Sequence, residues 1–130
     1  MEWLRAQFET PVDIAQVRVR ETDHPGSIVK VTAMLEDGRE IVMWQGAEPV
    51  GLTAPYEAAF NAGAGITARS IQIELDTSKT PGWEEIDAIE LVGRDGSRQW
   101  AKSVDASSSY GARNTAARWD ISSVLRMRGQ

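Results

Sequence analysis

The residues best suited to ligand chemistry lie in a short acidic segment that contains one tryptophan. A Pro-Gly turn at 81–82 precedes Trp83, Glu84 and Glu85, and an apolar run over 86–93 follows them. This order is typical of a turn that leads directly into a strand. An indole ring can stack on the apolar face of a sugar, while neighbouring carboxylates accept hydrogen bonds from its hydroxyl groups. The segment therefore predicts a ligand-binding loop; the alternative is that Trp83 plugs the end of the domain.

A second turn contains the other candidate ligand groups. Asp23 and His24 lie in it, next to Glu21, and a fold that joins the two turns would bring them near Asp87. We expect Asp23 and His24 to contribute to ligand binding, with a solvated turn histidine as the alternative. Glu21, Asp23 and Asp87 offer the carboxylate oxygens that Ca²⁺ prefers. The chain has no Asp-x-Asp-x-Asp spacing, so no cofactor is certain. These carboxylates can instead pair with strand arginines or cap turn amides.

The same residues make a weaker case for catalysis. A glycosidase needs two carboxyl groups that face one cleft, and a small β-sandwich offers no deep cleft for Glu85 and Asp87. His24 is the single histidine and has no recognisable nucleophile or metal ligand beside it in the sequence. The absence of cysteine excludes thiol catalysis and Cys-bound zinc, and no glycine-rich phosphate loop precedes a helix. We therefore predict that the protein is not an enzyme.

Length and charge restrict the class of protein further. A chain of 130 residues favours one domain with a core of its own. A net charge of −5 argues against nucleic acid and suits a neutral or cationic partner. The first five residues carry charges where a signal peptide has its apolar run, and no apolar stretch has the length of a membrane helix. The sequence as given predicts a soluble chain without a signal peptide and without membrane insertion.

Short alternating segments separated by turn residues position these candidates. Asp37-Gly38 and Asp95-Gly96 predict two hairpin turns, and Ala15-Gln16 interrupts the alternation as a β-bulge would. A longer loop is expected over 46–65. The strands are expected over residues 3–8, 12–20, 28–35, 41–44, 68–75, 86–92 and 99–109. Apolar residues at helical spacing within 114–128 predict a C-terminal tail that is helical, or otherwise disordered. The pattern is that of an all-β, antiparallel β-sandwich.

Two motifs give this pattern a family resemblance. Glu-Thr-x-x-Pro-Gly occupies residues 21–26, and Glu-Ile-Asp-Ala-Ile occupies residues 85–89. With their flanking strands they resemble the discoidin-like, galactose-binding-like β-sandwich of bacterial surface or exported proteins, over about residues 2–93. The resemblance implies a jelly roll, a secreted or cell-surface location, and a non-catalytic binding or adhesion module for carbohydrate or another surface ligand. The alternative is a structural or assembly domain without a small-molecule ligand, including an engineered or permuted fragment.

One segment departs from the resemblance. Relatives open with Ala-Ser-Ser-x-Tyr-Gly, whereas this chain carries Ala-Ser-Ser-Ser-Tyr-Gly at residues 106–111. A circular permutation would let residues 94–111 fill the place of the first strand, so that residues 1–111 form the domain and 112–130 the tail. Ala106 and Tyr110 would then be buried. A fragment cut from a tandem array is the alternative, and a segment that pairs with a neighbour would give a strand-swapped homodimer.

Overall fold

The described part of this computed structural model is built from antiparallel strands. It comprises residues 2–23, 26–48, 53, 56–76, 78, 82–107, 118–120 and 125–129, and it contains no α-helix. For residues 22–23, 82–85, 87, 118–120 and 125–129 the description is limited to the backbone. The predicted all-β, antiparallel class is confirmed. The jelly-roll sandwich itself stays a prediction.

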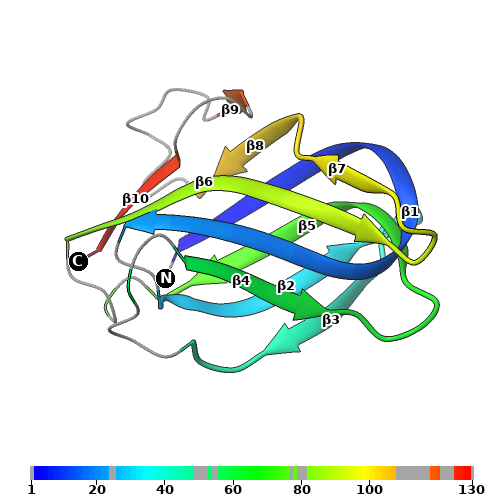
Figure 1. Cartoon of the computed structure of the whole chain (residues 1–130), viewed down its shortest axis with the longest axis horizontal. Helices are drawn as coiled ribbons and strands as arrows, with labels where there is room; N and C mark the ends of the chain where they lie inside the picture. The colour runs from blue at the N-terminus through cyan, green and yellow to red at the C-terminus, as the bar shows by residue number, and fades with distance from the viewer. Residues whose placement is uncertain are drawn as a thin grey trace.

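The strands follow one another along the chain with turns or loops between them (Figure 1). Their bounds are β1 Glu2–Asp23, β2 Ile28–Met34, β3 Glu40–Gln45, β4 Tyr56–Asn61, β5 Thr67–Leu75, β6 Gly82–Gly93, β7 Arg98–Trp100, β8 Ser103–Ala106, β9 Arg118–Asp120 and β10 Leu125–Gly129. The order along the main hydrogen-bonded path is β10-β6-β1-β5-β2-β3. Strand β4 pairs with β1, β7 with β6, and β8 with both β1 and β9.

The long first strand joins two groups of strands. Its first half pairs with β5 and β8, and its second half pairs with β4 and β6. The register on β5 shifts between Gln7 and Val12, where Pro11 lacks the N–H that a regular ladder needs. Two strands predicted on either side of Pro11 are therefore one bent strand. The predicted slip at Ala15-Gln16 is confirmed, since the register on β6 shifts between Ile14 and Gln16.

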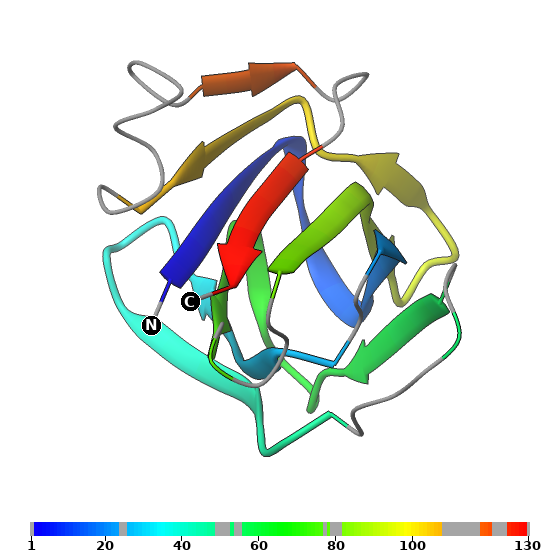
Figure 2. The ribbon, with the colours of Figure 1, turned by 90° about the vertical axis from the view of Figure 1, so that its left-hand side faces the viewer.

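Both groups of strands bury one face in a common core. Strand β5 alternates between exposed or half-buried and buried side chains along most of its length, as a strand with one solvated face does. The largest fully buried apolar side chains come from β1, β2, β5 and β6: Leu4, Phe8, Ile14, Ile28, Ile71, Ile73, Leu75, Ile86, Ile89 and Leu91. Figure 2, which faces the end where β6 begins, shows the strands arranged around this core.

Two tight turns close the β2–β3 and β6–β7 hairpins as predicted. Leu35 N–H donates to the Arg39 carbonyl at 2.8 Å, and Gly93 N–H donates to the Ser97 carbonyl at 2.8 Å. Gly38 and Gly96 have φ angles of 91° and 88°. Side chains with a Cβ rarely adopt this left-handed conformation, which explains glycine in both turns.

Pairing between distant segments corrects three predictions. The loop expected over 46–65 contains strand β4, which pairs with β1. The ligand-binding loop predicted at Trp83 and Glu84 is part of a strand, because β6 begins at Gly82 and pairs with β10. The helical form of the tail is wrong for residues 118–120 and 125–129, which are strands β9 and β10. Each segment is too short or too polar to signal a strand without its partner.

The segment after β7 lies beside the first half of β1. Strand β8 of this segment pairs antiparallel with β1, with Ala106 opposite Leu4. Ser107 N–H donates to the Trp3 carbonyl at 2.9 Å. Ala106 is buried, whereas Tyr110 lies outside the described residues. Residues 103–106 thus pair with β1 of the same chain. The circular permutation, in which this segment fills the position of the first strand of relatives, stays a prediction.

Candidate functional site

The two ends of β6 mark two different candidate regions. At its start, Glu85 lies opposite Asp23, and at its end Gly93 lies opposite Ile14. The first end contains the acidic segments chosen from the sequence. The second contains the bend of β1 and the β6–β7 turn (Figure 1).

At the first end the backbone brings the two predicted segments together. Asp23 pairs with Glu85, and Glu21 pairs with Ile86. Trp83 and Glu84 belong to β6 rather than to a loop, opposite Arg128 and Met127 of β10. His24 lies outside the described residues, as do the side chains of the rest of this candidate set: Asp23, Trp83, Glu84, Glu85 and Asp87. Their roles in ligand binding stay predictions.

Glu21 is the member of the predicted calcium set whose side chain is described. It is fully buried, and its Oε1 accepts a hydrogen bond from Gly26 N–H at 3.4 Å. Glu48, also buried, accepts one from Ile28 N–H at 3.0 Å. These contacts agree with the alternative interpretation of Glu21 as a carboxylate that caps a turn amide. Within the described residues no three acidic or histidine side chains are grouped to hold a metal ion, and Ca²⁺ binding stays a prediction.

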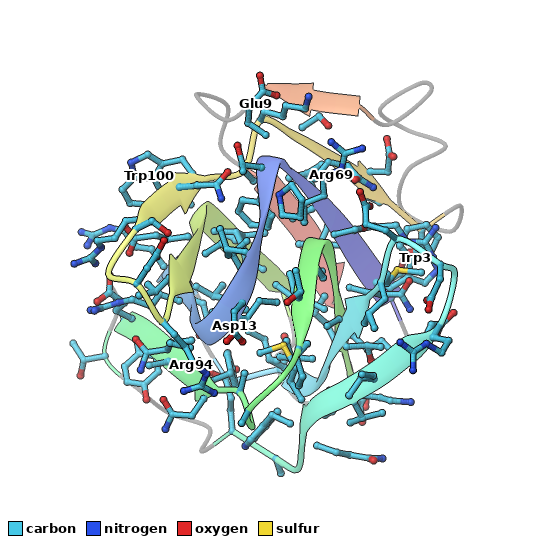
Figure 3. The ribbon with its side chains drawn as sticks, turned by 90° about the vertical axis from the view of Figure 1, so that its right-hand side faces the viewer. Trp3, Glu9, Asp13, Arg69, Arg94 and Trp100 are labelled. Carbon is cyan, nitrogen blue, oxygen red and sulfur yellow. The ribbon has the colours of Figure 1, made fainter. Side chains whose placement is uncertain are left out.

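An open pocket lies at the second end, where β1 bends past the β6–β7 turn. Its volume is about 560 Å³, within the range of small-molecule sites in proteins. It is lined by carboxylate, guanidinium, hydroxyl and apolar groups: Thr10, Pro11, Val12, Asp13, Thr67, Arg94 and Asp95. Figure 3 faces this end and shows Asp13 and Arg94 close to one another. None of these residues belongs to the ligand-binding or calcium set predicted from the sequence.

Fixed contacts orient the charged groups of the pocket. Arg94 donates through Nη2 to the Ala62 carbonyl at 2.7 Å, and its Nε lies 3.6 Å from Asp13 Oδ1. The Arg94 backbone N–H also donates to the Asp13 carbonyl at 2.9 Å. The hydroxyl and backbone N–H of Ser97 lower the pKa of the Asp95 carboxyl below its usual range. Asp95 is therefore ionised at neutral pH, and the three charged side chains together carry one net negative charge.

The turn that presents Arg94 and Asp95 depends on a buried glycine. A Cβ on Gly93 would lie 2.6 Å from Ser97 Oγ, 2.7 Å from Asp95 Oδ1 and 3.5 Å from Val12 Cβ. The first two separations are shorter than real Cβ contacts, so any side chain here would displace the Ser97 hydroxyl and the Asp95 carboxylate.

The same hairpin exposes a tryptophan on β7. Trp100 in β7 is 57% exposed and lies opposite Glu90 of β6. Glu90 accepts two hydrogen bonds from Arg98, at 3.0 Å from Nε and 2.7 Å from Nη2, which raises the pKa of the guanidinium. Gln99 bonds to both backbone groups of Thr10, at 2.8 and 3.0 Å. Trp100 is not among the predicted site residues; the alternation Arg98-Gln99-Trp100 after an Asp-Gly turn is the sequence signal that would have found this exposed ring.

Comparisons with family models, with curated proteins and with solved structures found no significant match. The discoidin-like resemblance therefore stays an expectation from the two motifs. The described part of the chain contains no helix long and apolar enough to cross a membrane.

Proposed function

We propose that this chain is a non-catalytic carbohydrate-binding module and that the pocket at the bend of β1 is its sugar site. The observation that carries the proposal is the mixed lining of that pocket, to which Asp13, Arg94 and Asp95 contribute charged groups and Pro11 and Val12 contribute apolar atoms. A sugar presents hydroxyl groups around its rim and C–H groups on its faces. A pocket with donors, acceptors and an apolar wall can satisfy all of them. A secreted or cell-surface location is part of the same proposal.

The charges of the pocket favour a neutral, polyhydroxylated ligand. A hydroxyl group can donate to the Asp13 or Asp95 carboxylate and accept from the Arg94 guanidinium. An anion would be repelled by two carboxylates, and a cation would lie against the guanidinium that Asp13 and the Ala62 carbonyl hold in place. A neutral sugar meets neither penalty.

The same charges support binding without catalysis. Sugar hydrolysis requires one carboxyl group with a raised pKa, so that it can donate a proton at neutral pH. The pKa of Asp95 is shifted in the opposite direction by Ser97. An ionised Asp95 is suited to accept hydrogen bonds from a sugar rather than to donate a proton to it.

A glycan array followed by calorimetry on its best sugars tests this proposal. We expect Arg94→Ala to weaken binding by about tenfold or more, because a charge-assisted hydrogen bond contributes about 1.5–3 kcal/mol. Arg39→Ala is the matched control, since Arg39 also lies in a hairpin turn and pairs with a nearby aspartate, Asp37, at 2.7 Å. An array without binding would reject the function. Binding that Trp83→Ala abolishes and Arg94→Ala leaves unchanged would move the site to the opposite end of β6.

A further inference from the structure

Gln99 of β7 is not among the residues that line the pocket, but it holds one of them. Its side chain bonds to both backbone groups of Thr10, which is part of the lining. We infer that Gln99 is a positioning residue for the sugar site and acts through the backbone at the bend of β1. The inference rests on the proposed function, because it takes the pocket as the sugar site. It adds that a residue outside the lining controls the affinity of the pocket.

The bend of β1 leaves its strand partners at the point where it lines the pocket. The ladder with β5 pairs Gln7 and resumes at Val12. The ladder with β8 ends at Gln7, and the ladder with β6 begins at Ile14. None of the ladders described for β1 therefore gives the Thr10 backbone a partner, and Pro11 has no N–H to donate. A backbone without a ladder partner has more conformational freedom to lose when a ligand orders it.

The amide of Gln99 takes the place of the missing strand partner. Thr10 N–H donates to Gln99 Oε1 at 3.0 Å, and Gln99 Nε2 donates to the Thr10 carbonyl at 2.8 Å. A carboxamide side chain offers an acceptor and a donor, as a peptide unit does. It can therefore occupy both backbone groups of one residue, as a neighbouring antiparallel strand would. Figure 1 shows β7 beside the bend of β1, where this contact is made.

The β6–β7 hairpin holds the bend at a second point. Arg94 N–H donates to the Asp13 carbonyl at 2.9 Å, and Arg94 Nε lies 3.6 Å from Asp13 Oδ1. The pocket wall over residues 10–13 is thus attached to one hairpin at both of its ends. Without the Gln99 amide, the Thr10 end would lose its attachment, and a sugar would have to order it on binding. A site that is ordered beforehand avoids this loss of affinity.

NMR spectroscopy of isotope-labelled protein tests the inference, with galactose, glucose and N-acetylglucosamine as probes. Gln99→Met keeps the length of the side chain and removes both hydrogen bonds. We expect faster hydrogen exchange at the Thr10 amide and unchanged exchange at the Ile14 amide, which donates to the Ile66 carbonyl at 2.8 Å. The Kd of each sugar that binds wild type should rise by about fivefold, the effect of about one neutral hydrogen bond.

Gln7→Met is the matched control for this substitution. Gln7 is also a half-buried glutamine whose side chain bonds to another part of the chain, with Nε2 3.1 Å from Ser70 Oγ. Neither Gln7 nor Ser70 lines the pocket. Gln7→Met should therefore bind the sugars like wild type and leave exchange of the Thr10 amide unchanged.

Gln99→Glu supplies a readout that a loss of stability alone would not change. The introduced carboxylate can accept from Thr10 N–H but cannot donate to the Thr10 carbonyl, whereas a protonated carboxyl group can. The ratio of the Kd of Gln99→Glu to that of wild type should therefore fall toward one from about pH 7 to about pH 4, near the ordinary pKa of glutamate. Wild type at each pH accounts for the titration of Asp13 and Asp95. The ratio for Gln7→Glu should stay near one at both pH values.

The outcomes separate the inference from the proposed function. If Arg94→Ala weakens sugar binding and Gln99→Met leaves it unchanged, the pocket is a sugar site but the inference is wrong. It is also wrong if Gln99→Met and Gln7→Met weaken binding equally, or if the Gln99→Glu ratio is the same at both pH values. If none of the three sugars binds wild type, the inference is rejected, and the glycan array alone decides the function. Circular dichroism melting establishes that each variant is folded; if Gln99→Met is not, the pH dependence of Gln99→Glu decides.

Discussion

The most direct test of the fold is the contact between β8 and the first half of β1. Val104 is the largest buried apolar side chain of β8, with 1% of its surface exposed, and it lies opposite Ala6. Val104→Ala removes two methyl groups from this contact. Each buried methyl or methylene group contributes about 0.8 kcal/mol, and the cavity left behind adds to the loss. We therefore expect the free energy of unfolding to fall by about 2 kcal/mol.

Urea denaturation followed by circular dichroism and tryptophan fluorescence measures this change. Val42→Ala is the control, because Val42 is 48% exposed and its truncation should change the free energy by less than about 0.5 kcal/mol. A deletion of residues 98–130 extends the same perturbation. It removes buried Ala101, Val104 and Ala106 and leaves the β1 edge unpaired. Those three side chains contribute about 3–5 kcal/mol, against a typical total of about 5–15 kcal/mol. We expect this shortened chain to lose cooperative unfolding.

Two results would refute the reasoning. Equal effects of Val104→Ala and Val42→Ala, or cooperative unfolding of the shortened chain at the native midpoint, would mean that β8 adds nothing to the core. The unfolding midpoint of wild type should also be independent of protein concentration, because β8 and β1 belong to one chain. A midpoint that rises with concentration would instead indicate a strand-swapped dimer.

Three further predictions concern the turn, the acidic group of the pocket and calcium. Gly93→Ala should lower the urea midpoint, because its Cβ would lie 2.6 Å from Ser97 Oγ. The control Gly63→Ala should leave the midpoint unchanged, because its Cβ meets nothing within 4 Å. Equal midpoints for the two variants would show that the close packing around Gly93 does not contribute to stability. The lowered pKa of Asp95 implies stability that is present above its unfolded pKa and is lost as pH falls through the folded pKa. Urea midpoints from about pH 7 to about pH 3 should therefore decline less in Asp95→Asn, and parallel profiles would contradict this. Because buried Glu21 already accepts a hydrogen bond from Gly26 N–H, we expect the same Tm with Ca²⁺ and with a chelator. If Ca²⁺ at 100 times its dissociation constant instead stabilises the folded protein by about 2.7 kcal/mol, the predicted calcium site is supported.

Local patterns account for the parts of the fold that sequence analysis predicted. Alternation of apolar and polar residues predicted strands β2, β3 and β5, and an Asp-Gly pair predicted each of the two tight hairpins. These features depend on neighbours a few residues away, which a sequence displays directly. Strands β4, β9 and β10 were missed because their stability comes from pairing with β1, β8 and β6, which lie far along the chain.

The candidate site shows the same division. The sequence by itself determined the antiparallel all-β class, through period-two alternation, and the turn in which Gly96 adopts a positive φ. It also contained the acidic segments at the start of β6. Only the tertiary structure decided that Thr10, Asp13, Thr67 and Arg94 line one pocket, because the bend of β1 and its pairing with β5 and β6 join them. The physical reason is that a strand's dihedral preferences are local, whereas a pocket exists only where segments distant in sequence meet.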